Sequence, residues 1–380
     1  MTSGIFGAGI PPAWARTLVD QTAFDDEQTR LAYVWTFLGF DKDAAKDGDW
    51  FRATLATRSV FVQRFGSELK GFENRCAHRS YPLRVADKGN GPIVCGFHHW
   101  RYDKDGHAVG IPMCQELFGA TPREIGARLT QIDIATCGTL VFGRFRASHA
   151  NESLEQFLGE SFPILQAMSR WQVEPRYLTR TVKANWRLCF HISVDDYHIV
   201  AVHPTTFGKV GYLKRENIGY FRVGGHSAYF TDPDPQGVTK MAAACREGTW
   251  RSANYRVFHI FPNLTVAHFL SDRQHWFILV LQYVPIAKDR SLMRAWLYSA
   301  PFPAAQPWYE RWIAPFTNPI RTVAVRYFAN RVLSEDNEVC ERLQTIAHQI
   351  DDRPILGALE ERVAWFEETY AKAVSSRPGA

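Results

Sequence analysis

This 380-residue chain has no long stretch of apolar residues and no long stretch of like-charged residues. No uncharged apolar run reaches the roughly 18 residues of a membrane-spanning helix. The amino terminus, MTSGIFGAGIPPAWAR, lacks the basic and apolar regions of a signal peptide. The 44 Lys and Arg residues are scattered, and the net charge is only +5. We therefore expect a soluble, cytoplasmic protein with neither a membrane nor a nucleic-acid partner.

Cysteine is also scarce, with seven residues in 380, and an odd number of widely spaced cysteines argues against a disulfide framework. A chain of this length can bury a core without such crosslinks. Its content of 46% hydrophobic and 22% charged residues is ordinary for a globular protein. There is no internal repeat or low-complexity tract. At roughly 150 residues per domain, we expect about two domains.

The local patterns change near residue 150. Residues 31–145 contain short β-branched and aromatic runs separated by turn residues, which predicts a small all-β domain. The later part combines strand-rich stretches at 219–231 and 255–285 with a helical pattern at 185–202. The predicted organisation is an N-terminal extension over 1–30, an all-β domain over 31–150 and an α+β domain over 151–380.

Four residues of the first domain have the spacing of metal ligands. One residue separates Cys76 from His78, and two separate Cys95 from His98. Each pair forms a short loop that can direct two ligands at one metal site. Two thiolates and two imidazoles suit either a tetrahedral zinc ion or a Rieske [2Fe–2S] cluster, in which two Cys bind one iron and two His the other. We expect the other five cysteines to be reduced, buried side chains.

The residues that flank these ligands favour the cluster. The pattern C-x-H-R, followed by C-x-x-H-x-W-x-Y and D-x-x-G, resembles the Rieske domain of ring-hydroxylating oxygenases. The resemblance implies that Cys76, His78, Cys95 and His98 bind a [2Fe–2S] cluster. One departure is His99, where the family usually has Gly. The C-x-x-H spacing selects His98 as the ligand, and we assign His99 to the surface or to the surroundings of the cluster.

A second group of ligand-type residues lies in the segment NWRLCFHISVDDYHIVAVHP. A helix over 185–202 would place Asp195 one turn before His198 and could turn His198 and His203 toward one point. A solvated polar helix face is the simpler interpretation. However, many apolar residues lie between these groups, which predicts a largely buried helix, and buried ionisable groups need partners.

The same segment resembles the catalytic domain of that family, which has an N-W-K-like start followed by D/E-x-Y-H-x4-H-P. The resemblance implies that His198 and His203 bind a mononuclear non-haem iron. It also implies a carboxylate from a late helix, in a pattern like E-D-x-x-x-x-E-x-x-Q, which places Asp336 as the third ligand of a facial triad. By itself, Asp336 would be read as an acidic residue near a helix N-terminus. Glu335 and Glu338 are the alternative ligands.

Asp195 has a separate role by resemblance. It is expected to bridge, through hydrogen bonds, a His ligand of the iron and a His ligand of the Rieske cluster in a neighbouring subunit. Such carboxylates fix the tautomer of a ligating histidine. His191 is a departure from the family pattern, which often has Asn there. We do not assign His191 as a ligand, and it could either hydrogen-bond near the iron or pack.

The resemblance implies a terminal oxygenase subunit whose catalytic domain has a helix-grip (START-like) fold with an antiparallel sheet. Its cofactors would be a Rieske [2Fe–2S] cluster and a mononuclear Fe(II). The sequence has no G-x-G-x-x-G dinucleotide fingerprint. Electrons would therefore come from a separate NAD(P)H-dependent reductase, directly or through a ferredoxin. The expected assembly is a homotrimer, with α3β3 as the alternative.

The expected reaction is the mono- or cis-dihydroxylation of an aromatic or apolar cyclic substrate with O2. Oxidative O- or N-demethylation is the alternative within the family, because the same iron site supports both and the pocket selects between them. Two alternatives come from other classes of protein. One is a non-enzymatic electron-transfer or ligand-binding protein that holds only the cluster, and the other is a protein stabilised by structural zinc.

Overall fold

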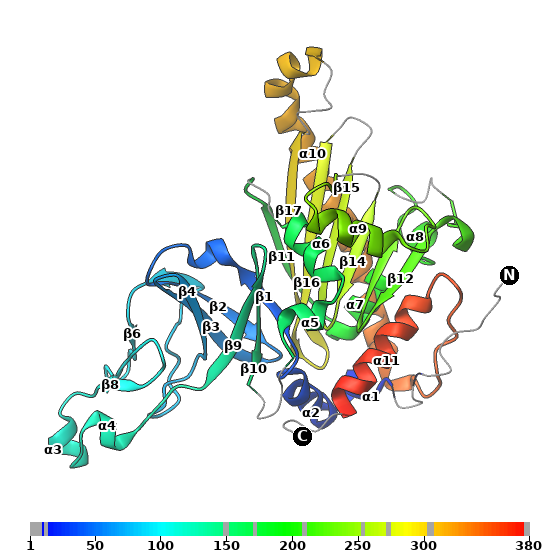
Figure 1. Ribbon diagram of the computed structural model, residues 1–380. Coiled ribbons are helices and arrows are strands. Elements are labelled where there is room, and N and C mark those ends of the chain that lie inside the picture. Colours follow the sequence, from blue (N-terminus) through cyan, green and yellow to red (C-terminus); the bar gives the residue numbers. More distant parts are fainter. Residues whose placement is uncertain are drawn as a thin grey trace. The chain divides into compact units, whose positions relative to one another are not determined.

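The computed structural model describes residue 10 and residues 14–146, 152–169, 173–206, 211–251, 255–270, 275–301 and 308–375. The chain divides into two compact units (Figure 1). The smaller unit is Gln28–Leu154. The larger unit is Glu155–Ser376 together with Met1–Glu27, so the first helices belong with the carboxyl-terminal part of the chain.

The smaller unit is built from antiparallel β-sheets. Its seven-stranded sheet has the order β1-β10-β9-β4-β3-β2-β5, and a three-stranded sheet has the order β6-β7-β8. The strands are β1 (Thr36–Phe40), β2 (Asp49–Leu55), β3 (Arg58–Phe65), β4 (Glu68–Glu73), β5 (Lys88–Asn90), β6 (Ile93–Val94), β7 (Arg101–Tyr102), β8 (Ala108–Gly110), β9 (Gln131–Cys137) and β10 (Leu140–Phe145). Two short helices, α3 (Cys114–Phe118) and α4 (Pro122–Ile125), follow β8.

Tight turns fix the pairing of the long strands in this unit. Strand β3 joins β4 through Gly66 and the residue after it, and β9 joins β10 through Gly138 and Thr139. Gly66 and Gly138 have φ values of 59° and 61°, which a residue without a Cβ adopts at little cost. These turns align the buried faces of the strands around one apolar core. The loops that follow β4 and β6 then carry the predicted cluster ligands.

The larger unit contains a second seven-stranded antiparallel sheet, in the order β11-β17-β16-β15-β14-β13-β12. Its strands are β11 (Arg176–Val182), β12 (Gly219–Val223), β13 (His226–Phe230), β14 (Arg256–Ile260), β15 (Leu264–Leu270), β16 (His275–Ala287) and β17 (Arg290–Pro301). Its helices are α1 (Arg16–Val19), α2 (Gln21–Leu31, which ends in the smaller unit), α5 (Leu154–Leu158), α6 (Ser161–Met168), α7 (Trp186–Val194), α8 (Ile199–Val202), α9 (Gly237–Arg246), α10 (Trp308–Ile346) and α11 (Glu361–Ser375).

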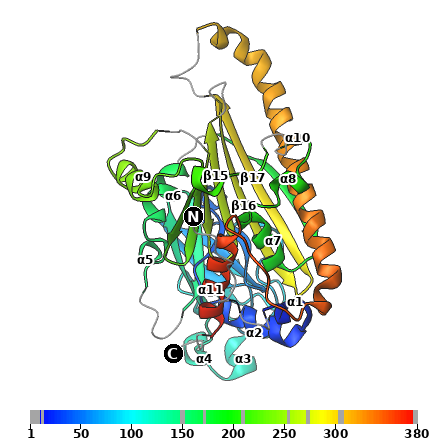
Figure 2. The ribbon, with the colours of Figure 1, turned by 90° about the vertical axis from the view of Figure 1, so that its right-hand side faces the viewer.

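Helices α7, α10 and α11 pack on one face of this sheet (Figure 2). Helix α7 contacts β16, α10 contacts β11 and α7, and α11 contacts β13 and α7. Val257, Ala267 and Leu279 lie directly opposite one another on three neighbouring strands. Their side chains therefore point to the same face of the sheet, where the helices pack. The face carries the apolar cores that hold these helices in place.

The helix predicted over 185–202 is wrong in one respect, because it is two helices separated by a turn. Helix α7 ends at Val194, and Asp195 has an extended backbone with φ −103° and ψ 125°. The Asp195 carboxylate accepts the amide of Tyr197 at 2.6 Å. Aspartate favours such local bonds over continuing a helix. The chain resumes helical structure only at α8, from Ile199, so that His198 and His203 flank a single short helix.

No helix among the described residues is both long enough and apolar enough to cross a membrane. All seven cysteines are free. Cys114 and Cys245 are half-buried, whereas the others are buried.

Candidate metal centres

The backbone of Cys76 makes two hydrogen bonds within the loop after β4. The amide of Cys76 donates to the carbonyl of Tyr81 at 2.9 Å, and the amide of Ser80 donates to the carbonyl of Cys76 at 3.0 Å. Ser80 completes the turn with a left-handed backbone, at φ 59°. His78 is thereby held within a tight turn, two residues from the thiol of Cys76.

The loop after β6 repeats this arrangement. The amide of Cys95 donates to the carbonyl of Trp100 at 2.9 Å, and the amide of His99 donates to the carbonyl of Cys95 at 3.0 Å. His99 occupies the left-handed position, at φ 57°, and its side chain is exposed. Glycine adopts this conformation most easily, which explains why Gly suits this position and His99 is the departure. His98 is half-buried.

The two loops bring their ligand-type side chains together. Cys76 and Cys95 are 2% and 1% exposed and belong to one buried cluster of side chains. The rings of His78 and His98 have centroids 4.8 Å apart, and His78 stacks on Trp100 at 4.7 Å. The Nδ1 atom of His78 is buried and makes no hydrogen bond among the described residues. A buried nitrogen of this kind is suited to bind a metal.

The electrostatics of these groups favour the neutral forms in the protein alone. Burial raises the pKa of the Cys95 thiol, and the neighbouring Cys76 raises it further. Burial also lowers the pKa of His78, as do His98 and Arg79. A neutral imidazole is the form that binds a metal, and a bound metal would supply the positive charge that stabilises the thiolates.

Tyr102, on β7, also contacts this group. Its hydroxyl oxygen lies 3.0 Å from Sγ of Cys76 and accepts the amide of Ala77 at 3.1 Å. Burial and the contact with Cys76 raise the pKa of Tyr102, so the hydroxyl keeps its proton. When Cys76 is a thiolate, this hydroxyl is the donor of the hydrogen bond. Tyr102 is part of the family pattern, but its contact with Cys76 is evident only in the structure.

Three ligand-type side chains converge in the larger unit. Oδ1 of Asp336, on α10, lies 3.0 Å from Nε2 of His203 and 3.5 Å from Nε2 of His198. One ligand atom from each residue falls within 4.8 Å of the other two. Helix α10 contacts both α7 and α8, which brings Asp336 to the two histidines from about 130 residues further along the chain.

Charge attraction holds this group together. Burial alone would lower the pKa of His198, but the carboxylates of Asp195 and Asp336 raise it to about 9. The pKa of His203 is raised against its own burial by Asp336 and Glu335. Burial would raise the pKa of Asp336, and the two imidazoles lower it instead. A metal bound here would displace the protons that these carboxylates hold on the imidazoles. Two His with one carboxylate form the facial set of non-haem iron.

Glu335 contacts the site from the far side of the His203 ring. Its Oε2 lies 2.9 Å from Nδ1 of His203, and Arg331 donates to its other oxygen at 3.0 Å. This bond places the proton of His203 on Nδ1 and leaves Nε2 facing Asp336. The sequence offers Glu335 only as an alternative to Asp336 as ligand, and the bond to Nδ1 of His203 is evident only in the structure. Glu338 is exposed and pairs with Arg342.

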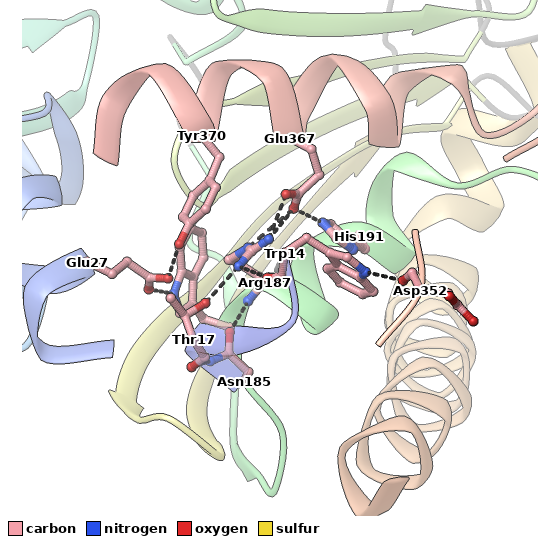
Figure 3. Close-up of polar contacts among 10 residues, drawn as sticks. Trp14, Thr17, Glu27, Asn185, Arg187, His191, Asp352, Glu367 and Tyr370 are labelled. Atoms are coloured by element: carbon pink, nitrogen blue, oxygen red, sulfur yellow. Dashed lines mark hydrogen bonds and ion pairs between the residues drawn. The ribbon is translucent and has the colours of Figure 1, made fainter. Parts of the chain in front are cut away.

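Asp195, in the break after α7, and His191, within α7, have different partners. Oδ2 of Asp195 is 3.5 Å from Nδ1 of His198, next to the candidate iron site. Nε2 of His191 instead donates to Oε1 of Glu367 at 2.7 Å, and its ring stacks on Trp14 (Figure 3). His191 therefore belongs to a buried polar network between α7 and α11.

Comparisons with known proteins identify both domains. The model of the ring hydroxylating alpha subunit (catalytic domain) matches residues 163–376, and the model of the Rieske [2Fe-2S] domain matches residues 34–124. The chain belongs to the ring-hydroxylating alpha subunit family. The predicted fold class, a Rieske domain followed by a catalytic domain with an antiparallel sheet, is confirmed. Membership implies a [2Fe–2S] cluster in the first domain and a mononuclear iron in the second.

Two curated relatives of this alpha subunit are aromatic-ring oxygenases by name. The large oxygenase component of salicylate 5-hydroxylase from Ralstonia sp. is 27% identical over 227 residues, which cover 56% of this chain and 52% of that protein. Subunit alpha 2 of the terminal oxygenase component of terephthalate 1,2-dioxygenase from Comamonas sp. is 29% identical over 230 residues, which cover 56% and 54%. The alpha subunit thus spans about half the length of the curated relatives it matches.

Two solved structures share the fold of this alpha subunit over nearly its whole length. Naphthalene 1,2-dioxygenase from Rhodococcus sp., bound to indole, has a TM-score of 0.72 at 19% identity and covers 95% of this chain and 93% of its own. The quaternary ammonium Rieske monooxygenase CntA, in complex with an inhibitor, has a TM-score of 0.73 at 15% identity and covers 98% and 96%.

The residues of both sites fit the groups that the family implies. In the Rieske domain, two buried thiols, two half-buried imidazoles and the unpartnered Nδ1 of His78 suit a cluster with two sulfur and two nitrogen ligands. In the catalytic domain, Oδ1 of Asp336 is buried and makes no hydrogen bond of normal geometry among the described residues. It nevertheless faces two imidazole nitrogens, as a shared metal ligand would.

Proposed function

We propose that this chain is the terminal oxygenase component of a multicomponent Rieske oxygenase. It would use O2 and externally supplied electrons to hydroxylate an aromatic or apolar cyclic substrate. The convergence of His198, His203 and Asp336 on one point is the observation that carries this proposal. The names of relatives that act on aromatic rings support the substrate class.

In the catalytic domain, His198, His203 and Asp336 would hold a mononuclear Fe(II) from one side and leave the other coordination positions open. The iron, when bound, supplies the activation of O2. Glu335 keeps the proton of His203 on Nδ1, so that Nε2 is available as a ligand. The residues near the site therefore supply both the ligands and the orientation of one of them.

In the Rieske domain, Cys76, Cys95, His78 and His98 would hold the [2Fe–2S] cluster. Neutral histidine ligands give such a cluster a higher reduction potential than four cysteines would. The proposed electron donor is a separate NAD(P)H-dependent reductase, directly or through a ferredoxin, because the sequence has no dinucleotide-binding fingerprint.

Asp195 is the proposed link between the two cofactors. Its carboxylate lies beside Nδ1 of His198, and its side chain is 21% exposed, so it could accept a second hydrogen bond from a neighbouring subunit. We propose a homotrimer in which that second bond comes from the partner's cluster ligand. An α3β3 assembly is the alternative.

Oxidative demethylation is a second candidate, favoured by two other relatives. The alpha subunit of N,N-dimethyl phenylurea N-demethylase from Sphingobium sp. is 24% identical over 226 residues. Methylxanthine N1-demethylase NdmA from Pseudomonas putida is 23% identical over 192 residues. Hydroxylation and demethylation give different products from a methylated substrate, since only demethylation releases formaldehyde.

The test combines metal analysis with turnover. The purified protein is expected to hold about three irons and two acid-labile sulfides per chain, whereas a cluster-only protein would hold about two irons. Substrate-dependent O2 consumption, with a surrogate reductase, should then be measured across aromatic acids, polycyclic compounds and methyl ethers. Zinc in place of iron and sulfide would contradict the proposal.

Matched variants test the proposed residues. H198A and D336N should keep the cluster spectrum, lose about one iron per chain and lose oxygenation. E338Q is the control, because Glu338 lies on α10 near Asp336 but points to solvent. Oxygenation that survives in H198A would show that the mononuclear site is elsewhere.

A further inference from the structure

The turn that carries Asp195 and His198 is hydrogen-bonded to helix α11 and to the residues just before it. The amide of Asp196 donates to the carbonyl of Leu359 at 3.1 Å, just before α11 begins. Nη2 of Arg362, on α11, donates to Oδ2 of Asp196 at 2.6 Å. The hydroxyl of Tyr220, on β12, donates to the same carboxylate oxygen. Asp196 thus has three partners outside its own turn.

Arg362 is itself enclosed. Its side chain is 1% exposed and that of Asp196 is 12% exposed. Nη1 of Arg362 donates to Nδ1 of His259 at 3.0 Å, and the guanidinium lies over the ring of Tyr220 at 4.6 Å. Burial and the Arg362 charge hold the pKa of His259 well below its ordinary value, so this ring is a neutral acceptor. Asp196 is therefore the one anion bonded to this buried cation among the described residues.

The position of Asp196 in the chain connects this pair to the candidate iron site. Asp196 lies between Asp195 and His198, in a turn without the regular hydrogen bonds of α7. On one side of the turn, Asp195 approaches Nδ1 of His198 at 3.5 Å. On the other side, Asp196 is bonded to Arg362. In the absence of helical hydrogen bonds, such side-chain bonds fix where the turn lies.

A second buried pair holds the preceding helix to the same element. Nη2 of Arg187, near the start of α7, lies 2.6 Å from Oε2 of Glu367 on α11, with side chains 0% and 1% exposed (Figure 3). His191 contacts the same carboxylate. Helix α11 therefore binds α7 through Glu367 and the turn after α7 through Arg362.

We propose that Arg362 is a positioning residue for the iron site, which acts through Asp196 to place His198 and Asp195 relative to Asp336. The role rests on the proposed function, because it assumes that His198 and Asp336 bind the metal. The family pattern D/E-x-Y-H leaves the position of Asp196 open, so the pattern itself does not predict this anchor. Residues behind metal ligands tune affinity because they fix the ligand's orientation.

The experiment compares R362M, R362K and D196N with the wild type and with E368Q. R362M removes the charge and keeps an unbranched side chain in place of the aliphatic part of arginine, R362K keeps the charge, and D196N keeps the shape of its partner. E368Q is the matched control, since Glu368 lies on the same helix and pairs with Arg222 at 2.7 Å, with both side chains more than one-third exposed. H198A marks the loss of the site itself.

Metal affinity is the main measurement. Protein that retains its cluster but has been stripped of mononuclear iron is titrated with Co(II), and bound cobalt is measured by equilibrium dialysis. We expect R362M to weaken Co(II) binding about 10- to 100-fold, D196N to weaken it less, and R362K to recover part of the loss. The signal of the Fe(II) complex with nitric oxide in electron paramagnetic resonance should broaden in R362M. The cluster spectrum and E368Q should match the wild type.

The outcomes separate this inference from the proposed function. Wild-type affinity in both R362M and D196N, or an equal loss in E368Q, would overturn the positioning role. If R362M gives no folded protein, D196N decides, because its side chain is isosteric. If wild type and H198A bind Co(II) equally, the proposed metal site is wrong, whatever the Arg362 variants do.

Discussion

Glu335 and Asp336, consecutive residues of α10, contact opposite ring nitrogens of His203. Oε2 of Glu335 lies 2.9 Å from Nδ1, and Oδ1 of Asp336 lies 3.0 Å from Nε2. Side chains of consecutive helical residues diverge by about 100° around the axis, so the imidazole lies between them. One carboxylate can then orient the ring while the other faces a metal on its far side.

This arrangement makes Glu335 the residue that sets the tautomer of His203. In E335Q the side-chain amide can either donate or accept, so the proton is no longer held on Nδ1. We expect the variant to bind Co(II) or Fe(II) about 10- to 100-fold more weakly, because the ligating nitrogen is protonated in part of the molecules. Titration of protein stripped of mononuclear iron measures the loss.

The control for this prediction is E338Q, one turn along the same helix face but 61% exposed at its side chain. Equal affinity in E335Q and the wild type would show that the bond to Nδ1 does not orient His203.

Tyr102 leads to a prediction for the cluster. Its hydroxyl lies 3.0 Å from Sγ of Cys76, and hydrogen bonds to the sulfur ligands raise the reduction potential of an iron–sulfur cluster. Y102F should therefore keep the Rieske absorption spectrum but have a lower potential in a spectroelectrochemical titration. Y81F, which changes an exposed tyrosine of the first loop, should keep the wild-type potential. An unchanged potential in Y102F would mean that the hydroxyl does not donate to Cys76.

Residue spacing alone indicates more of the first site than of the second, for a physical reason. Cys76 and His78 lie in one tight loop and Cys95 and His98 in another, so spacing alone indicates which side chains share a turn. The second site needs α10 to pack against α8. The bond of Glu335 to His203 spans 132 residues and follows from that packing. Nothing in the local pattern around Glu335 distinguishes it from an ordinary solvated acid.

The break between α7 and α8 shows a different limit. Apolar residues continue through the segment, and their pattern predicts one helix over 185–202. The amide contacts made by the side chain of Asp195 compete with the helix, and Asp196 is pulled toward Arg362, 166 residues further along the chain. The first cause is local and can be recognised from the consecutive aspartates. The second is tertiary and cannot be recognised from the sequence.

His99 leads to a prediction about stability and about the identity of the ligand. It has a left-handed backbone at φ 57°, which costs a residue with a Cβ about 1 kcal/mol. Glycine adopts this conformation without that cost, but it loses more entropy on folding, which offsets part of the gain. H99G should therefore raise the free energy of unfolding by roughly 0.5–1 kcal/mol. Because His99 is exposed, the cluster content and spectrum should not change.

Ser80 provides a comparison in the other loop, since it has the equivalent position and a φ of 59°. S80G should change stability in the same direction. Loss of the Rieske spectrum in H99G, but not in H98A, would instead assign His99 as the cluster ligand.

Glu367 leads to a prediction about pH. Burial alone would raise its pKa, but Arg187 and His191 lower it from 4.5 to about 2. A lowered pKa in the folded state stabilises the protein above the pKa of the unfolded state, and that stabilisation is lost as the pH falls toward the folded value.

E367Q leaves Arg187 buried without its anion, which should cost about 3–5 kcal/mol at neutral pH. The difference between wild type and E367Q should narrow from about pH 4.5 downward, as urea unfolding followed by circular dichroism would show. E368Q, in its exposed pair, should differ little from the wild type. A difference for E367Q that stays constant down to about pH 3 would mean that Glu367 does not carry the charge that Arg187 requires.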